Sequence, residues 1–128
     1  HGISLNGKDA GEVDLLLKKD DREVAIFEGL KLNSVNSQYI KEHIDKAIVN
    51  YNALGTPTFI VAYVGAANFE GFWNRYFEFL AAYSYPLNVK RTLEQIVSTS
   101  AAIRSANMVL SRDGFDFPVY FTAVNLRQ

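Results

Sequence analysis

The order of apolar and polar residues near the start of the chain predicts a β-hairpin. Residues 11–17 and 24–32 are two apolar runs rich in strand-forming side chains. The polar link at 18–23 turns the chain between them. These two runs are therefore expected to lie side by side as strands of one sheet.

The middle of the chain switches between helical and strand patterns. A cap within 34–37 predicts a helix that runs to about residue 53. The continuous apolar run at 58–64 is typical of a buried central strand, and large apolar residues at helical spacing predict a second helix over 69–83. A helix between two strands predicts that those strands pair in parallel.

The last third of the chain ends in a second predicted hairpin. Apolar runs at 103–111 and 117–124 flank the turn at 112–114, whose Asp-Gly dipeptide strongly favours a hairpin. Residues 87–98 are ambiguous, and we interpret them as a short helix. The predicted fold class is α/β, a central mixed β-sheet flanked by helices, in a single domain that spans 1–128.

Two carboxylates, Asp14 and Glu28, stand on the first predicted hairpin. An unpaired buried charge is costly, and two neighbouring carboxylates repel each other unless a cation lies between them. Oxygen ligands of this kind suit Mg²⁺ or Mn²⁺. The pair therefore predicts a metal-dependent phosphodiesterase site.

The segment 11–32 also resembles the PD-(D/E)xK, or restriction-endonuclease-like, superfamily of nucleases. Its members carry an Asp at the start of one hairpin strand and a (D/E)-x-K sequence on the next. The resemblance implies a restriction-endonuclease-like fold and a nuclease, for which DNA is expected as substrate in preference to RNA. It also implies that Asp14 and Glu28 are the catalytic metal ligands. Glu12 shares a strand face with Asp14 and is expected to support the site.

The chain departs from the family at the lysine, because Leu30 occupies its position. Lys31 comes one residue later and is expected on the opposite strand face, unless a β-bulge at Gly29 turns it toward the site. We take Lys31 as the first candidate for the catalytic lysine and Lys8 as the second. Two lysines of the following helix are further candidates, Lys41 and Lys46. The remaining alternative is a degenerate site that no longer cleaves its substrate.

Polar residues follow one flank of the first predicted helix: Tyr39, His43, Lys46 and Asn50. The resemblance implies that this helix packs beside the metal-binding strands, where His43 would orient water or contact a phosphate. The alternative is a histidine that is hydrogen-bonded at the boundary between helix and sheet. Neither His43 nor His1 has a partner at the spacing of zinc ligands, so no zinc site is expected.

The charge of the chain limits how it can bind nucleic acid. The net charge is −1, and the 13 Lys and Arg residues are scattered rather than gathered in a basic stripe. Tight binding to DNA through this domain alone is therefore not expected. We expect either a nuclease domain that other domains of a larger protein deliver to DNA, or a catalytically degenerate domain that binds nucleic acid or a protein partner. An unrelated small α/β enzyme has no motif to support it.

Three further expectations concern the setting of the domain. The chain has no Cys, which is compatible with a cytoplasmic location. Its apolar runs are too short to span a membrane. It begins at His1 without Met, and residues 3–5 leave no room for the helix that usually precedes the first strand in the family. We therefore expect a fragment of a longer protein that lacks this first helix.

Overall fold

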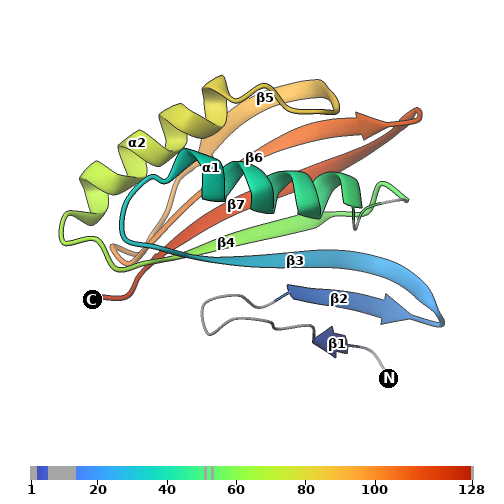
Figure 1. Ribbon diagram of the computed structural model, residues 1–128, viewed down its shortest axis with the longest axis horizontal. Helices are drawn as coiled ribbons and strands as arrows, with labels where there is room; N and C mark the ends of the chain where they lie inside the picture. The colour runs from blue at the N-terminus through green and yellow to red at the C-terminus, as the bar shows by residue number, and fades with distance from the viewer. Residues whose placement is uncertain (1–2, 6–13, 51, 53, 128) are drawn as a thin grey trace.

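The computed structural model describes residues 3–5, 14–50, 52 and 54–127. These residues form a seven-stranded mixed sheet and two α-helices (Figure 1). None of the helices in this described part of the chain is long and apolar enough to cross a membrane. In chain order the elements are β1 (Ile3–Leu5), β2 (Asp14–Lys19), β3 (Arg22–Leu32), α1 (Ser37–Asp45), the π-helical turn η1 (Lys46–Asn50), β4 (Thr58–Val64), α2 (Phe69–Ala82), β5 (Asn88–Ile96), β6 (Ile103–Arg112) and β7 (Phe115–Asn125).

The sheet has the strand order β1-β2-β3-β4-β7-β6-β5. The first three strands form an antiparallel meander, and the last three form another. The two meanders meet through β4, which runs parallel to both β3 and β7. The predicted α/β class, the mixed sheet and the parallel pairing around the first helix are confirmed.

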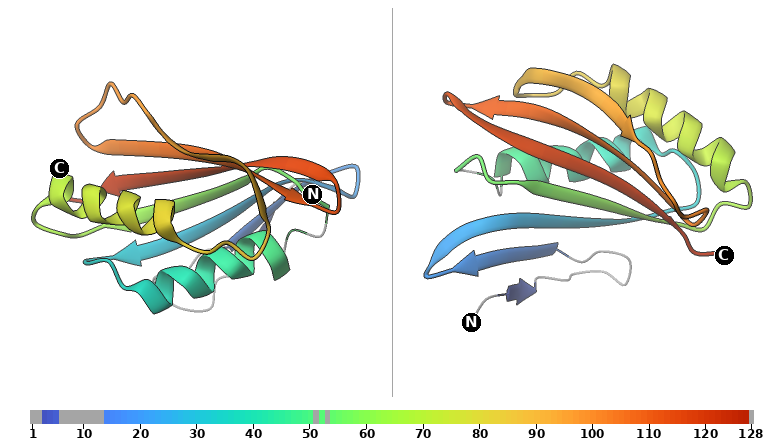
Figure 2. Two further views of the ribbon diagram at one scale, coloured as in Figure 1. Left: turned by 90° about the horizontal axis from the view of Figure 1, so that it is seen from above. Right: turned by 180° about the vertical axis from the view of Figure 1, so that it is seen from behind.

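Both helices cover the same face of the sheet. Alternate positions of β3, β4, β6 and β7 are buried, and they belong to one core cluster together with the inward residues of α1 and α2. Figure 2 shows the helices gathered on one side of the strands. The other face carries half-buried and exposed side chains, among them Phe59 and Tyr120, whose rings stack with centroids 4.9 Å apart.

Local contacts fix helix α1 against both the sheet and α2. Asn36 caps the helix, because its side chain accepts a hydrogen bond from the backbone N–H of Tyr39. Ile40 and Ile44 are fully buried on the apolar side. At the other end, the Tyr83 hydroxyl donates to Asp45 Oδ1 at 2.6 Å, and burial together with this bond raises the pKa of Tyr83. The polar flank of α1 is thereby held over β3.

Three elements differ from the sequence predictions. The short helix expected at 87–98 is wrong, because this segment forms edge strand β5. Almost every residue of β5 is exposed, so the strand carries no alternation of apolar and polar positions. The first helix leaves α-helical geometry at Asp45 and continues as the π-helical turn. The three residues of β1 form a further edge strand that the pattern did not predict.

Candidate functional site

Glu28 is a fully buried carboxylate on the helix-covered face of β3. It lies between Ile26 and Leu30, which are buried on the same face of the strand. Strand alternation explains the placement, since residues two apart share a face. A carboxylate among apolar neighbours is costly unless partners compensate its charge. Glu28 therefore needs polar or cationic side chains beside it.

Asp14 lies directly opposite Glu28 in the antiparallel pair of β2 and β3. The structure places Asp14 through this backbone pairing, and the register is continuous from Asp14 to Leu17. The hairpin thus sets the two sequence-predicted acidic positions opposite each other along the two strands.

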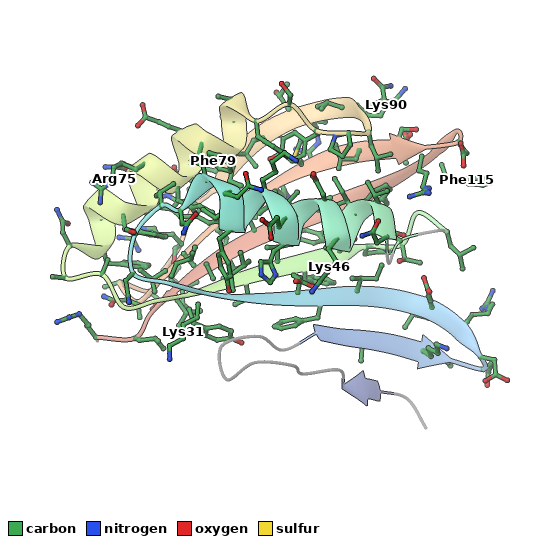
Figure 3. All side chains as sticks on the ribbon, in the orientation of Figure 1. Lys31, Lys46, Arg75, Phe79, Lys90 and Phe115 are labelled. Atoms are coloured by element: carbon green, nitrogen blue, oxygen red, sulfur yellow. The ribbon has the colours of Figure 1, made fainter. Side chains whose placement is uncertain are left out.

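Two cationic or ionisable residues of the first helix meet Glu28. His43 Nδ1 lies 2.5 Å from Glu28 Oε2, and the Lys46 ammonium lies 3.6 Å from the same oxygen. Figure 3 shows Lys46 beside β3, below the helix that carries it. The spacing of three residues places both side chains on one flank of the helix. Positions far apart in sequence therefore form a carboxylate, imidazole and ammonium cluster.

The π-helical turn begins at Lys46, which is the last residue of this cluster along the chain. The backbone N–H of Lys46 donates to the carbonyl oxygens of both Glu42 and His43, and η1 begins at that residue. Single π turns inside helices occur frequently at functional sites. The change of helical winding thus falls at the residue that brings its ammonium to Glu28.

An aromatic ring supports the imidazole from the preceding turn of α1. Tyr39 and His43 have ring centroids 4.4 Å apart, with planes inclined by 56°. His43 itself is 5% exposed, so the imidazole is almost entirely removed from water. The ring contact restricts the orientation in which His43 faces Glu28.

Lys31, the first candidate for the catalytic lysine, lies away from this cluster. The β3–β4 register runs without interruption from Ile26 to Leu32, so the ladder contains no bulge at Gly29. Lys31 therefore stays on the face opposite Glu28, where it is exposed. Figure 3 shows Lys31 toward the C-terminal end of β3, apart from Lys46. Leu30, at the family's lysine position, is completely buried in the core.

Lys41, Lys8 and Glu12 are the remaining candidate residues of the site. Lys41 forms an ion pair with Asp45 along the exposed side of α1, with Nζ 3.2 Å from Oδ2. Lys8 and Glu12 lie outside the described residues. Of the helix lysines considered from sequence, Lys46 is the one that the structure brings to Glu28. The signal that identifies it is its position three residues after His43 on the same helix flank.

The residues at positions 14 and 28 have the carboxylate chemistry that the hard divalent cation of the family resemblance would need. Glu28 supplies carboxylate oxygen, and the register sets a second carboxylate residue, Asp14, opposite it. Mg²⁺ and Mn²⁺ bind through one or two such carboxylates. Among the side chains that the structure describes, no three His, Asp or Glu residues gather into a metal-binding group. The fit therefore rests on the pair at positions 14 and 28.

Comparisons of the chain with protein-family models, with curated proteins and with solved structures found no match.

Proposed function

We propose that this domain hydrolyses phosphodiester bonds of nucleic acid, DNA in preference to RNA, with Mg²⁺ or Mn²⁺ as cofactor. One observation carries the proposal: Lys46 Nζ lies 3.6 Å from Oε2 of buried Glu28. An ammonium beside the expected metal ligand supplies, from the helix, the group that the strand lacks at Leu30. The cross-strand pairing of Asp14 with Glu28 supports the same proposal.

Asp14 and Glu28 would hold the metal ion, which supplies a positive charge beside the phosphate and lowers the pKa of a water molecule. Lys46 would stabilise the negative charge that develops on the phosphate in the transition state. Its side chain is 25% exposed, so it is partly open to solvent. His43 would hold the Glu28 carboxylate in one orientation through the contact to Oε2.

The near-neutral charge of the domain suggests how it meets its substrate. A net charge of −1 gives little electrostatic attraction to a polyanion. We propose that other domains of a larger protein deliver the nucleic acid to this site. Cleavage by the domain alone is then expected to need low salt and a high protein concentration.

Lys46 and Lys31 are the two lysines compared as candidates for the catalytic role, and their replacement should have different effects. We expect Lys46→Met to lower the rate of metal-dependent cleavage by about 100-fold or more, because it removes a charge aimed at the transition state. Lys31→Met, the same change on the opposite sheet face, should leave the rate within about threefold. Single-turnover cleavage of a labelled DNA duplex measures both variants.

The melting temperature of each variant serves as the control for folding. Met keeps the length of the aliphatic stem, so Lys31→Met should melt close to the unmodified protein. Lys46→Met also removes a cationic partner of buried Glu28 and should melt lower, so its cleavage is compared at a temperature at which it is fully folded. A large loss of rate in Lys31→Met, with Lys46→Met near normal, would assign the catalytic lysine to β3 and overturn this part of the proposal.

A second candidate function is a non-catalytic domain that binds single-stranded nucleic acid. The observation that favours it is the sheet face opposite the two helices, which none of the helices and strands described in the structure covers. Phe27, Phe59 and Tyr120 are register partners across β3, β4 and β7, and therefore form an aromatic row on that face. Bases stack on exposed aromatic rings in a way that tolerates any sequence. The absence of lysine at Leu30 points the same way.

The same face carries charges of both signs together with polar groups. Three paired rows cross β3, β4, β7 and β6 there, and Lys31 is the charged residue among them. The rows are Phe27, Phe59, Tyr120 and Asn107; Gly29, Val61, Thr122 and Ser105; and Lys31, Tyr63, Val124 and Ile103. On β5 the first row continues to Glu94, whose carboxylate pairs with Arg91. Hydroxyl and amide groups in the rows offer hydrogen bonds to a polyanion.

The binding function predicts a loss of affinity when the aromatic row is interrupted. We expect Phe59→Ala to weaken binding of a fluorescent oligothymidine in chelator by about tenfold, since one stacked base contributes about 1–3 kcal/mol. Phe115→Ala, the same change at the exposed first residue of β7, is the matched control. Equal affinities of the two variants, or no binding by the unmodified protein, would exclude this function.

A further inference from the structure

The C-terminal end of α1 makes polar contacts with two different elements. On one side, the Tyr83 hydroxyl at the end of α2 donates to Asp45 Oδ1 at 2.6 Å. On the other side, Lys46 Nζ lies 3.6 Å from Oε2 of Glu28 on β3. Successive residues of a helix point about 100° apart, so neighbours in sequence can face different elements. The contact to α2 therefore lies directly beside the residue whose ammonium meets Glu28.

Tyr83 is a donor with a fixed place. Its ring stacks on that of Phe79 with centroids 5.7 Å apart and meets the Tyr85 ring edge-on at 4.9 Å. Burial and the bond to Asp45 raise the pKa of Tyr83, so the hydroxyl keeps the proton that it donates. Oδ2 of Asp45 pairs with Lys41 at 3.2 Å. The bond from Tyr83 thus ties Asp45 to α2, whereas the pair with Lys41 stays within α1.

We propose that Tyr83 is a positioning residue, which acts through Asp45 to hold the Lys46 ammonium against Glu28. The inference rests on the proposed function for the part that Lys46 plays in cleavage, and it adds a residue of α2 to the site. A charge stabilises a transition state only from the right place, and a displacement of about 1 Å can lower a rate by about 100-fold. Without the bond to α2, the end of α1 can move and carry Lys46 with it.

The competing explanation is a hydrogen bond that stabilises the fold and has no effect on Lys46. The helical segment has other anchors, since Asn36 caps its start and Arg112 donates to the Val49 carbonyl oxygen of η1 at 2.9 Å. Loss of one hydroxyl should therefore leave the protein folded. The two explanations differ in whether the rate still depends on Tyr83 once Lys46 has been replaced.

Single-turnover cleavage of a DNA duplex, over a range of protein concentrations, tests the role of Tyr83. We expect Tyr83→Phe to lower the maximal rate constant about tenfold and to leave the concentration at half-saturation within about twofold. Tyr85→Phe is the matched control, because it also deletes one phenol hydroxyl, which donates to the Leu80 carbonyl oxygen at 2.8 Å. Its rate should stay within about twofold of the unmodified protein.

A double-mutant cycle separates positioning from stability. In a Lys46→Met background, Tyr83→Phe should slow the residual cleavage by less than about twofold, because its effect passes through the missing ammonium. Asp45→Asn keeps an oxygen that accepts the Tyr83 hydroxyl and should retain the rate, whereas Asp45→Ala should lose about tenfold. Equal slowing by Tyr83→Phe in both backgrounds, or an unchanged rate in folded Tyr83→Phe, would overturn the role of Tyr83 and leave the proposed function standing.

Nuclear magnetic resonance of the Lys46 side chain gives a readout that needs no cleavage. Its ε-methylene resonance is assigned by its absence in Lys46→Met. Tyr83→Phe should shift this resonance toward the values of exposed lysines, and Tyr85→Phe should not. An unmoved resonance in Tyr83→Phe, or the same shift in Tyr85→Phe, would refute the positioning role. The expected shift in a protein that cleaves no nucleic acid would refute the proposed function and leave the contact role of Tyr83 standing.

Discussion

Glu28→Gln is expected to reduce metal-dependent cleavage by at least about 100-fold, because it removes the charge of a proposed metal ligand. The substitution keeps the volume of the side chain, and its amide can still bond to the His43 imidazole. The effect should therefore fall on metal binding more than on packing. Single-turnover cleavage and Mn²⁺ affinity, measured on the same preparation, report the two losses together.

Glu42→Gln is the matched control for this prediction. It makes the same change at an exposed position of α1, where the Glu42 carboxylate accepts a bond from Gln38 at 2.9 Å. Its cleavage rate should stay within about twofold of the unmodified protein. Full activity of a folded Glu28→Gln protein would remove Glu28 from the catalytic site.

Trp73→Ala is expected to lower the free energy of unfolding by about 3–5 kcal/mol. Trp73 lies on α2 and is completely buried, with its ring 6.0 Å from those of both Tyr76 and Phe77 by centroids. Its removal leaves a large cavity between α2 and the sheet, where rigid strands and neighbouring aromatic rings limit collapse. Urea unfolding followed by circular dichroism measures the difference.

Val97→Ala tests whether that loss comes from burial. Val97 is 91% exposed in the loop between β5 and β6, so its truncation should change the free energy of unfolding by less than about 0.5 kcal/mol. A loss below about 1 kcal/mol in Trp73→Ala would mean that α2 does not depend on this core contact.

Local pattern was enough to predict the parts of the fold that have one buried side. Strands β3, β4 and β7 alternate or run continuously apolar because α1 and α2 cover one of their faces. The second predicted hairpin is observed as β6 and β7, with its turn at Asp113-Gly114. The first hairpin set Asp14 opposite Glu28, because strand order and turn length determine the register.

The elements that sequence did not predict depend on pairing rather than burial. Strand β5 gains its structure from hydrogen bonds to β6, and since nearly all its side chains are exposed, its sequence carries no strand period. The same holds for the short strand β1, which is defined by its pairing with β2. The π-helical turn after Asp45 lies within an apolar pattern that is equally compatible with continued α-helix.

The residues of the candidate site also differ in whether the sequence alone could identify them. Glu28 could be identified from sequence because a carboxylate within an apolar strand contradicts the local pattern. Lys31 is the first candidate from sequence because a β-bulge at Gly29 would turn it toward the site. The β3–β4 register has no bulge there, so Lys31 stays on the opposite face. His43 lacks a partner at ligand spacing in sequence, yet packing of α1 on β3 brings it to Glu28, 15 positions away.

Cleavage by the unmodified protein tests directly whether the domain is a metal-dependent nuclease. Single- and double-stranded DNA and RNA would be incubated at low salt with Mn²⁺, with Mg²⁺ and with a chelator, beside Asp14→Ala. We expect cleavage that requires metal, is faster for DNA than for RNA, and disappears in Asp14→Ala. A folded protein that cleaves none of the four substrates in either metal would contradict it.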